Sequence, residues 1–306
     1  MNISFRILIL IVIVGFVNAC KSKKNPEKSI IKDSEAVAFA TSEERDRKVI
    51  FYSMLLPTEM SRIFEKVGAN YDPSIINPTD QFSSYDNPHS IAVNIGIYGV
   101  DMSYARLFDQ SAETAKYFTT IQMMTERLGI PEDLYDDLLK KIEENISQKD
   151  SLITYTTEMY ERIDHFLKEK NNNGYAALIV MGGWIEALYI ASEIFDKNPD
   201  NIEIMDRIAE QKYSLNSLIS LLSNYQEDIK VAEYLLMLKR LREAYDKFEI
   251  YYERSGLELD TIEKQITAEG YDSGVTTDII MEIGNLIAEI RMGFIEPRVE
   301  RDIVIP

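Results

Sequence analysis

The stretch GYAALIVMGGWIEALYIASEIF, residues 174–195, decides the fold because it is apolar on nearly every side of a helix. A helix that has no polar face is buried at the centre of a protein. The stretch IAVNIGIYGVDMSYARLF, residues 91–108, has the same character. Together they predict an all-α, multi-helix antiparallel bundle with two apolar central helices, at about 90–108 and 174–196.

The rest of the chain also favours helices. Asn87 followed by Pro88 is typical of a helix start, and a glycine or a run of asparagines follows several of the expected helices. Asn198 followed by Pro199 gives the same start signal. Alternating β-branched runs are few, which argues against extensive strands. The remaining helices are expected at about 111–128, 131–146, 149–170, 199–223, 228–254, 259–268 and 275–293.

The N-terminus, MNISFRILILIVIVGFVNACKSKK, has the features of a lipoprotein signal peptide. An apolar run from Ile7 to Val17 is shorter than the roughly 20 residues that span a bilayer, and Ala19 precedes Cys20, the only cysteine. We therefore expect a signal peptide at 1–19 and acylation at Cys20, which ties the chain to a membrane. A spanning anchor would need a longer apolar run.

Charge and composition limit the other expectations. The polar stretch 20–42 is expected to be a lipidated tether, 43–296 a single all-α domain, and 297–306 an extended tail. The net charge of −18 argues against nucleic acid as a partner, because nucleic-acid binding requires Lys and Arg at the phosphates. In the bacterial lipoproteins that this N-terminus resembles, an acidic run after the cysteine is associated with surface export. Lysines follow Cys20 here instead, so the resemblance implies the periplasmic face, with the outer membrane as the expected location.

Two carboxylates stand alone in the central helices, at Asp101 and Glu186. Burial penalises an unpartnered carboxylate, so each should be hydrogen-bonded, paired with Arg106 or another basic residue, or open to a solvated pocket. The candidate pocket or buried polar network comprises Asn94, Tyr98, Asp101, Tyr104, Trp184, Glu186 and Tyr189. These residues are compatible with two interpretations. One is a hydrogen-bonded internal network, and the other is a pocket for a small amphipathic molecule or a cation.

Each central helix also carries two glycines near its acid, Gly96 and Gly99 in one and Gly182 and Gly183 in the other. A glycine inside a helix costs about 0.5–1 kcal/mol relative to alanine. We therefore expect the two backbones to approach closely at these positions.

Patterns typical of catalysis or metal binding do not occur in the sequence. The two histidines, His89 and His165, lack the Glu-x-x-His spacing of di-iron bundles, and a lone cysteine gives zinc no cluster. Phosphate-binding loops and the Gly-x-Ser-x-Gly elbow are missing as well. Catalytic residues, a metal site and a cofactor are not expected, and a hydrolase using the buried carboxylates is the most distant alternative.

Three stretches carry a resemblance to a known group. They are SMLLPTEMSRIFEKVGANYDPSIINPTDQFSSY at 53–85, SIAVNIGIYGVDMSYARLF at 90–108 and AALIVMGGWIEALYIASEIF at 176–195. They resemble uncharacterised envelope lipoproteins of Bacteroidota, which have a Leu-Pro segment and similar Asn-x-Gly-x-Tyr-x-x-Asp-x-Ser-Tyr and Gly-Gly-Trp-x-Glu helices. The resemblance implies a lipid-anchored helical envelope protein and brings no activity.

The expected role is therefore a non-enzymatic one, in which a lipid-anchored, periplasm-facing protein binds an envelope protein partner or scaffolds an assembly. The alternative is a small-molecule or cation-binding module near Asp101 and Glu186.

Overall fold

The structure is a computed structural model of the 306-residue chain. It describes residues 63–64, 66–145, 148–170, 174–249, 251–252, 257–260, 265–268, 271–272 and 275–296. The expected signal peptide, the acylated Cys20, the tether and the tail at 297–306 lie outside the described residues.

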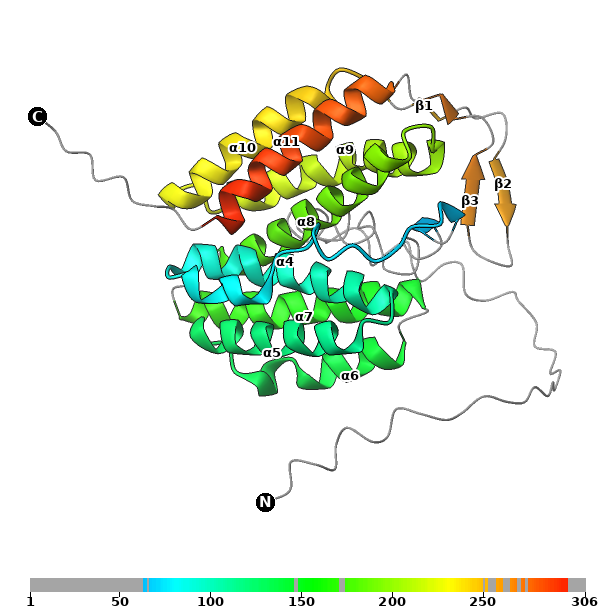
Figure 1. Cartoon of the computed structure of the whole chain (residues 1–306). Coiled ribbons are helices and arrows are strands. Elements are labelled where there is room, and N and C mark those ends of the chain that lie inside the picture. Colours follow the sequence, from blue (N-terminus) through cyan, green and yellow to red (C-terminus); the bar gives the residue numbers. More distant parts are fainter. Residues whose placement is uncertain are drawn as a thin grey trace, which may run out of the picture. The chain divides into compact units, whose positions relative to one another are not determined.

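The described residues confirm the all-α prediction, with neighbouring helices packed antiparallel (Figure 1). The elements before residue 175 are η2 Thr79–Ser84, α4 Pro88–Leu107, α5 Ser111–Arg127, η3 Glu132–Leu134, α6 Asp136–Glu144 and α7 Lys149–Glu169. Those after it are α8 Tyr175–Lys197, α9 Ile202–Ser223, α10 Ile229–Tyr245 and α11 Thr277–Ile295.

Short strands lie between α10 and α11, where helices were expected from the sequence. The strands are β1 Tyr251–Tyr252, β2 Leu257–Asp260, β3 Gln265–Ala268 and β4 Tyr271–Asp272. β1 pairs with β4 and β2 with β3, both antiparallel. The helix predicted at 259–268 is therefore wrong, and the one predicted at 228–254 ends at Tyr245. The alternation of apolar and polar residues in LELD and QITA has the period of a strand.

Of the two helix starts predicted from an Asn-Pro pair, one is confirmed and one is wrong. Asn87 caps α4 as expected, since its side chain accepts a 2.9 Å hydrogen bond from the Ser90 amide. The sixth helix does not start at Asn198: it begins at Ile202, because the Asn201 side chain accepts from the Ile204 amide at 2.9 Å. Pro131 opens the 3-10 turn η3 before α6, so the predicted helix 131–146 is split.

α4 and α8 form the central pair, as the sequence predicts. A Cβ on Gly96 would lie 2.0 Å from the Ile179 carbonyl oxygen, and one on Gly182 would lie 2.0 Å from the Val93 carbonyl oxygen. Both helices therefore need glycine where their backbones cross. The expectation is wrong for Gly99, which has nothing within 4 Å of its Cβ position.

α8 also contacts α7, α9 and α11, which surround it (Figure 1). Among the described residues it is the one helix long and apolar enough to cross a membrane, yet 72% of its most apolar window is buried within the protein. That burial identifies α8 as a core helix of this body. It places Glu186, near the middle of α8, deep among other helices.

Candidate functional site

Asp101 of α4 and Glu186 of α8 meet inside the protein. Both side chains belong to residues with 0% exposure, and they lie within hydrogen-bonding reach of one another. The closeness follows from the glycine crossing, because Gly96 and Gly182 bring the two helix backbones into contact near both acids. The two acids therefore form one site rather than two.

The basic partner of this site comes from α11. Arg291 Nε donates to Glu186 Oε2 at 2.5 Å and Arg291 Nη2 donates to Glu186 Oε1 at 2.7 Å. The guanidinium also lies over the ring of Tyr189, 4.1 Å from its centroid. Such a two-pronged ion pair fixes the orientation of the carboxylate as well as neutralising it. The suggested partner Arg106 is instead exposed in the last turn of α4.

Asp101 differs electrostatically from Glu186. Burial raises the pKa of Asp101 well above its usual range, and the charge and hydrogen bond of Glu186 raise it further. Its Oδ1 has no donor among the described residues. A proton on Asp101 explains both facts, since the carboxyl then donates to the Glu186 carboxylate. The three side chains together are then electrically neutral.

The segment from Ile75 to Pro78, which we call the strap, covers this cluster. Two of its main-chain groups bind the cluster directly. The Asn77 amide donates to Asp101 Oδ2 at 3.1 Å, and Arg291 Nη2 donates to the Ile75 carbonyl at 3.2 Å. The strap belongs to no helix or strand, so side chains form several of the hydrogen bonds to its backbone.

Tyrosines hold the other main-chain groups of the strap. Tyr117 donates to the Asn77 carbonyl at 2.8 Å, and Tyr98 donates to the Pro78 carbonyl at 2.9 Å. Burial raises the pKa of both hydroxyls, so they remain neutral donors. The strap is therefore fixed by side chains from α4, α5 and α11.

Asn94 and Asn77 extend the network toward the end of α11. Asn94 Nδ2 donates to the carbonyls of Ser90 and Phe294, at 3.0 Å each. Asn77 Nδ2 donates to the hydroxyl of Tyr85 at 2.9 Å and to Asn94 Oδ1 at 3.3 Å. These bonds tie α4 to α11 as well as to the strap.

Not all the predicted site residues meet here. Asn94, Tyr98 and Tyr189 contact the cluster or its cover, as described above. Tyr104 accepts from the amide of Asp72, just before the strap, at 3.1 Å. Trp184 belongs elsewhere, because its Nε1 donates to Gln211 and Ser214 of α9 at 3.2 and 3.0 Å.

Arg291 and Asn77 belong to the site but were not predicted from the sequence. One signal was available for Arg291, which is the only basic residue in the apolar helix TDIIMEIGNLIAEIRMGFI. A lone cation in such a helix demands a buried acid. Asn77 gives no such signal, because a polar residue in the loop-like stretch SIINPTDQ is unremarkable by composition.

The histidines take part in ordinary structural contacts. His89 Nε2 lies 2.8 Å from Asp228 Oδ2, and Asp228 also caps α10. His165 lies 3.7 Å from Glu169 on an exposed face. Within the described ranges, His, Cys, Asp and Glu side chains form no group of three or more that could hold a metal.

Comparison of the chain with protein-family models, with curated proteins and with solved structures found no match.

Proposed function

We propose that this chain is a lipid-anchored envelope protein that binds an amphipathic helix of a protein partner on the outer face of α10 and α11. The anchor rests on the apolar leader and the lone Cys20, and the resemblance to envelope lipoproteins agrees with it. The observation that carries the partner-binding role is an exposed row of large apolar side chains on these two helices.

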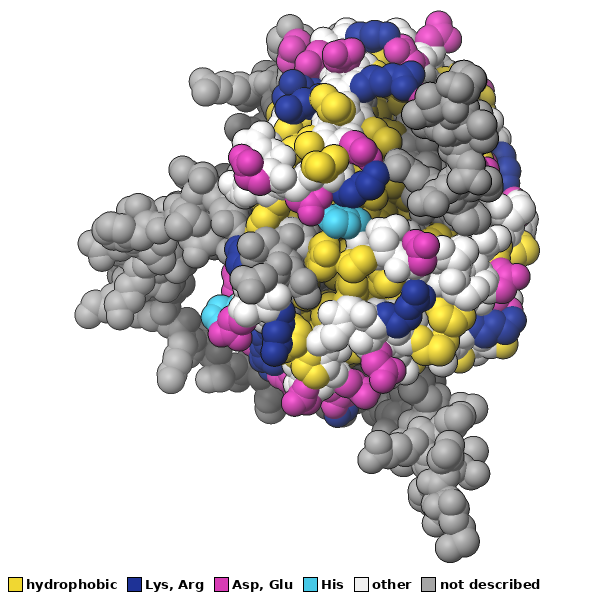
Figure 2. All heavy atoms as spheres, turned by 90° about the vertical axis from the view of Figure 1, so that its left-hand side faces the viewer, with side chains coloured by type: hydrophobic (Ala, Val, Ile, Leu, Met, Phe, Trp, Pro, Cys, Tyr) yellow, Lys and Arg dark blue, Asp and Glu magenta, His cyan; other side chains and the backbone are white. Residues whose placement is uncertain are grey.

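The row is formed by Ile229 and Leu236 on α10 and Met292 on α11, which are 78%, 67% and 49% exposed. Ile229 and Leu236 are seven residues apart and share one face of their helix. α10 and α11 pack together, with the ring of Tyr234 5.1 Å from that of Phe294. Apolar side chains also lie exposed between charged ones in the view from the left of Figure 1 (Figure 2). An apolar row with a charged border is typical of an interface.

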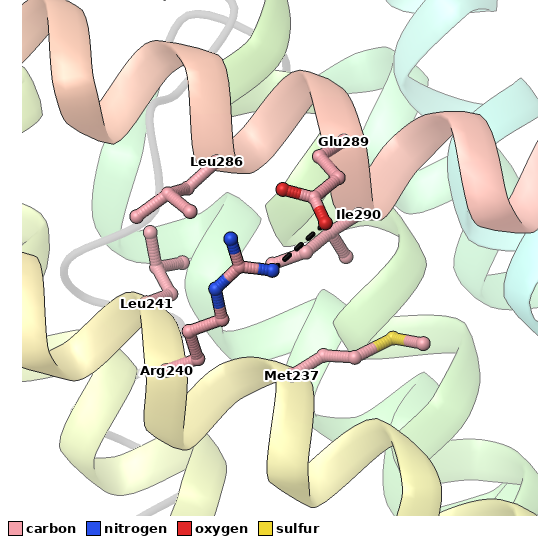
Figure 3. A pocket seen from close by; sticks show the side chains of 6 residues that line it. All are labelled: Met237, Arg240, Leu241, Leu286, Glu289 and Ile290. Carbon is pink, nitrogen blue, oxygen red and sulfur yellow. Dashed lines mark hydrogen bonds and ion pairs between the residues drawn. The ribbon is translucent and has the colours of Figure 1, made fainter.

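A hollow of about 60 Å³ lies between the same two helices (Figure 3). Its apolar lining comes from both sides: Met237, Leu241, Leu286 and Ile290. Arg240 and Glu289 also line it and form a 2.8 Å ion pair that links the two helices. A shallow apolar groove between paired helices, bordered by charges, accepts the apolar face of a third helix.

The alternative, a small-molecule or cation pocket at Asp101 and Glu186, receives less support. The chain itself supplies the partners of both acids, through Arg291 and Asn77. Neither acid has any exposed surface. A ligand would have to displace a bidentate ion pair that is already formed.

The experiment compares two apolar side chains of nearly equal exposure. Leu236→Asp disrupts the proposed face, whereas Ile202→Asp, at a residue 66% exposed on α9, is the matched control. We expect the wild-type protein and the control, extracted in mild detergent, to migrate together on native gels in a complex larger than the free lipidated chain. Leu236→Asp should migrate as the free chain. Equal migration of the two variants would overturn the proposal.

Self-association has to be excluded by a separate experiment. Two differently tagged copies of the chain, expressed together, should not co-purify; if they do, the occupant is a second copy and the proposed partner is wrong.

The lipid anchor has its own test. Palmitate labelling should vanish in Cys20→Ala, and labelling that persists would remove the lipid anchor from the proposal.

A further inference from the structure

We propose that Asp101 is a proton-binding site whose occupancy fastens the strap, Ile75–Pro78, over the helices. This inference concerns the core of the protein and is independent of the surface proposed for partner binding. It rests on the charges, the enclosure and the contacts of one residue.

The charge balance requires a bound proton. Asp101 and Glu186 are fully enclosed, and among the described residues the cation beside them is Arg291, which is hydrogen-bonded to Glu186. Both nitrogens of Arg291 that face Glu186 are used in the bidentate pair, and Nη2 also serves Ile75. With both acids ionised, the enclosed cluster would carry a net negative charge, which burial strongly disfavours.

The geometry assigns the proton to Asp101. Each carboxylate oxygen of Glu186 already accepts a charge-assisted hydrogen bond from Arg291. Asp101 receives one hydrogen bond, from the neutral Asn77 amide to Oδ2, and its Oδ1 receives none. A proton on Oδ1 satisfies that atom and joins the two carboxyl groups.

The other groups that face Asp101 provide no compensating charge. They are the hydroxyls of four tyrosines: Tyr98 of α4, Tyr117 of α5 and, from the segments flanking the strap, Tyr71 and Tyr85. Burial raises the pKa of each hydroxyl, so all four stay neutral at pH values where a carboxyl can ionise. None of these described groups can therefore replace the proton on Asp101.

Loss of that proton should open the strap before it disturbs the packing of α4 and α8. A second negative charge beside Glu186 must be relieved by water, and water has to enter past whatever covers Asp101. α4 and α8 are held by their own backbone hydrogen bonds and by the glycine crossing. The strap lies directly on Asp101 and is held by individual side-chain contacts. It is therefore the part of the cover that opens first.

Hydrogen exchange of the full chain in detergent tests this inference. The readout is the protection of peptides covering the strap, with peptides from α8 as an internal reference. The variant Asp101→Asn is the matched control, because its amide can donate to Glu186 and accept from Asn77 as the protonated acid does. Comparing the two proteins at each pH removes the intrinsic pH dependence of exchange.

We expect the wild-type strap to lose at least tenfold more protection than the strap of the Asp101→Asn variant as the pH rises, while α8 stays equally protected in both. We also expect the wild type to show an infrared carbonyl band of a protonated carboxylic acid at neutral pH that Asp101→Asn lacks. Identical strap protection in the two proteins would overturn the inference. So would loss of protection in α8 together with the strap, or an unchanged infrared band.

Discussion

Arg291 holds Glu186 through two hydrogen bonds, of 2.5 and 2.7 Å, although the two residues are 105 positions apart in the chain. The pair joins α11 to the central helix α8, and Arg291 is itself 6% exposed. It therefore differs in kind from the exposed pairs that link the surfaces of neighbouring helices. Its consequences can be measured.

Removal of one partner of the Arg291–Glu186 pair should lower the free energy of unfolding far more than removal of both. Arg291→Met leaves Glu186 buried without a cation, and breaking a buried pair in this way costs about 3–5 kcal/mol of unfolding free energy. The double variant Arg291→Met, Glu186→Leu should recover much of that loss. Urea denaturation measures both. Arg240→Met, which breaks the exposed pair with Glu289, is the control and should change stability little. A double variant no more stable than Arg291→Met would contradict this account.

The glycines of the central helices should separate into two classes. Gly96→Ala and Gly182→Ala place a methyl group 2.0 Å from a carbonyl oxygen of the facing helix, and overpacking of a core typically costs about 1–3 kcal/mol or more. Gly99→Ala meets open space and should stabilise the same helix by about 0.5–1 kcal/mol. Thermal unfolding of the three variants gives the comparison. A loss of stability in Gly99→Ala would refute the explanation.

The tyrosines that hold the strap should matter through their hydroxyls. Tyr117→Phe leaves the buried carbonyl of Asn77 without its donor, and an unsatisfied buried group costs about 1–3 kcal/mol. Tyr98→Phe should do the same at Pro78. Tyr213→Phe removes a hydroxyl from an exposed residue and should be neutral. Chemical denaturation of each variant tests the contrast, and equal effects at all three positions would show that the strap bonds contribute nothing.

The pH dependence of stability should reveal Asp101. Its pKa is raised in the folded protein, so the folded state binds the proton more tightly than the unfolded state does. The stability that this proton contributes is present below the unfolded pKa and is lost as the pH rises toward the folded pKa, by up to about 1.4 kcal/mol per pH unit.

Asp101→Asn should therefore lose less stability than the wild type as the pH increases. The free energy of unfolding of the variant should rise relative to that of the wild type. Measuring that difference also cancels Asp206, whose pKa burial raises to about 6 in both proteins. Urea denaturation at a series of pH values provides the data. Parallel curves for the two proteins would exclude a buried proton at Asp101.

The sequence allowed the helical body to be predicted because its signals are local. Asn87 and Pro88 mark the start of α4, and the absence of a polar face marks α4 and α8 as central. The strands between Tyr251 and Asp272 escaped notice because two- and four-residue strands offer too little alternation to compete with helical periodicity.

The site could be predicted only in half. A single carboxylate in an otherwise apolar helix can be recognised in the sequence, and Asp101 and Glu186 were predicted as site residues on that basis. Their partner could not be assigned, since spacing along the chain says nothing about a contact between α8 and α11. The same holds for Trp184, whose neighbours on α9 are fixed by the three-dimensional packing alone.

The position of Arg291 in the order of synthesis has a further consequence. Glu186 is made more than a hundred residues before its cation, so a growing chain that already contains α4 and α8 still lacks the guanidinium that their burial demands. The two central helices cannot settle into their final packing until α11 has emerged. The helices of this protein should therefore complete their packing only after α11 has been synthesised, when Arg291 can pair with Glu186.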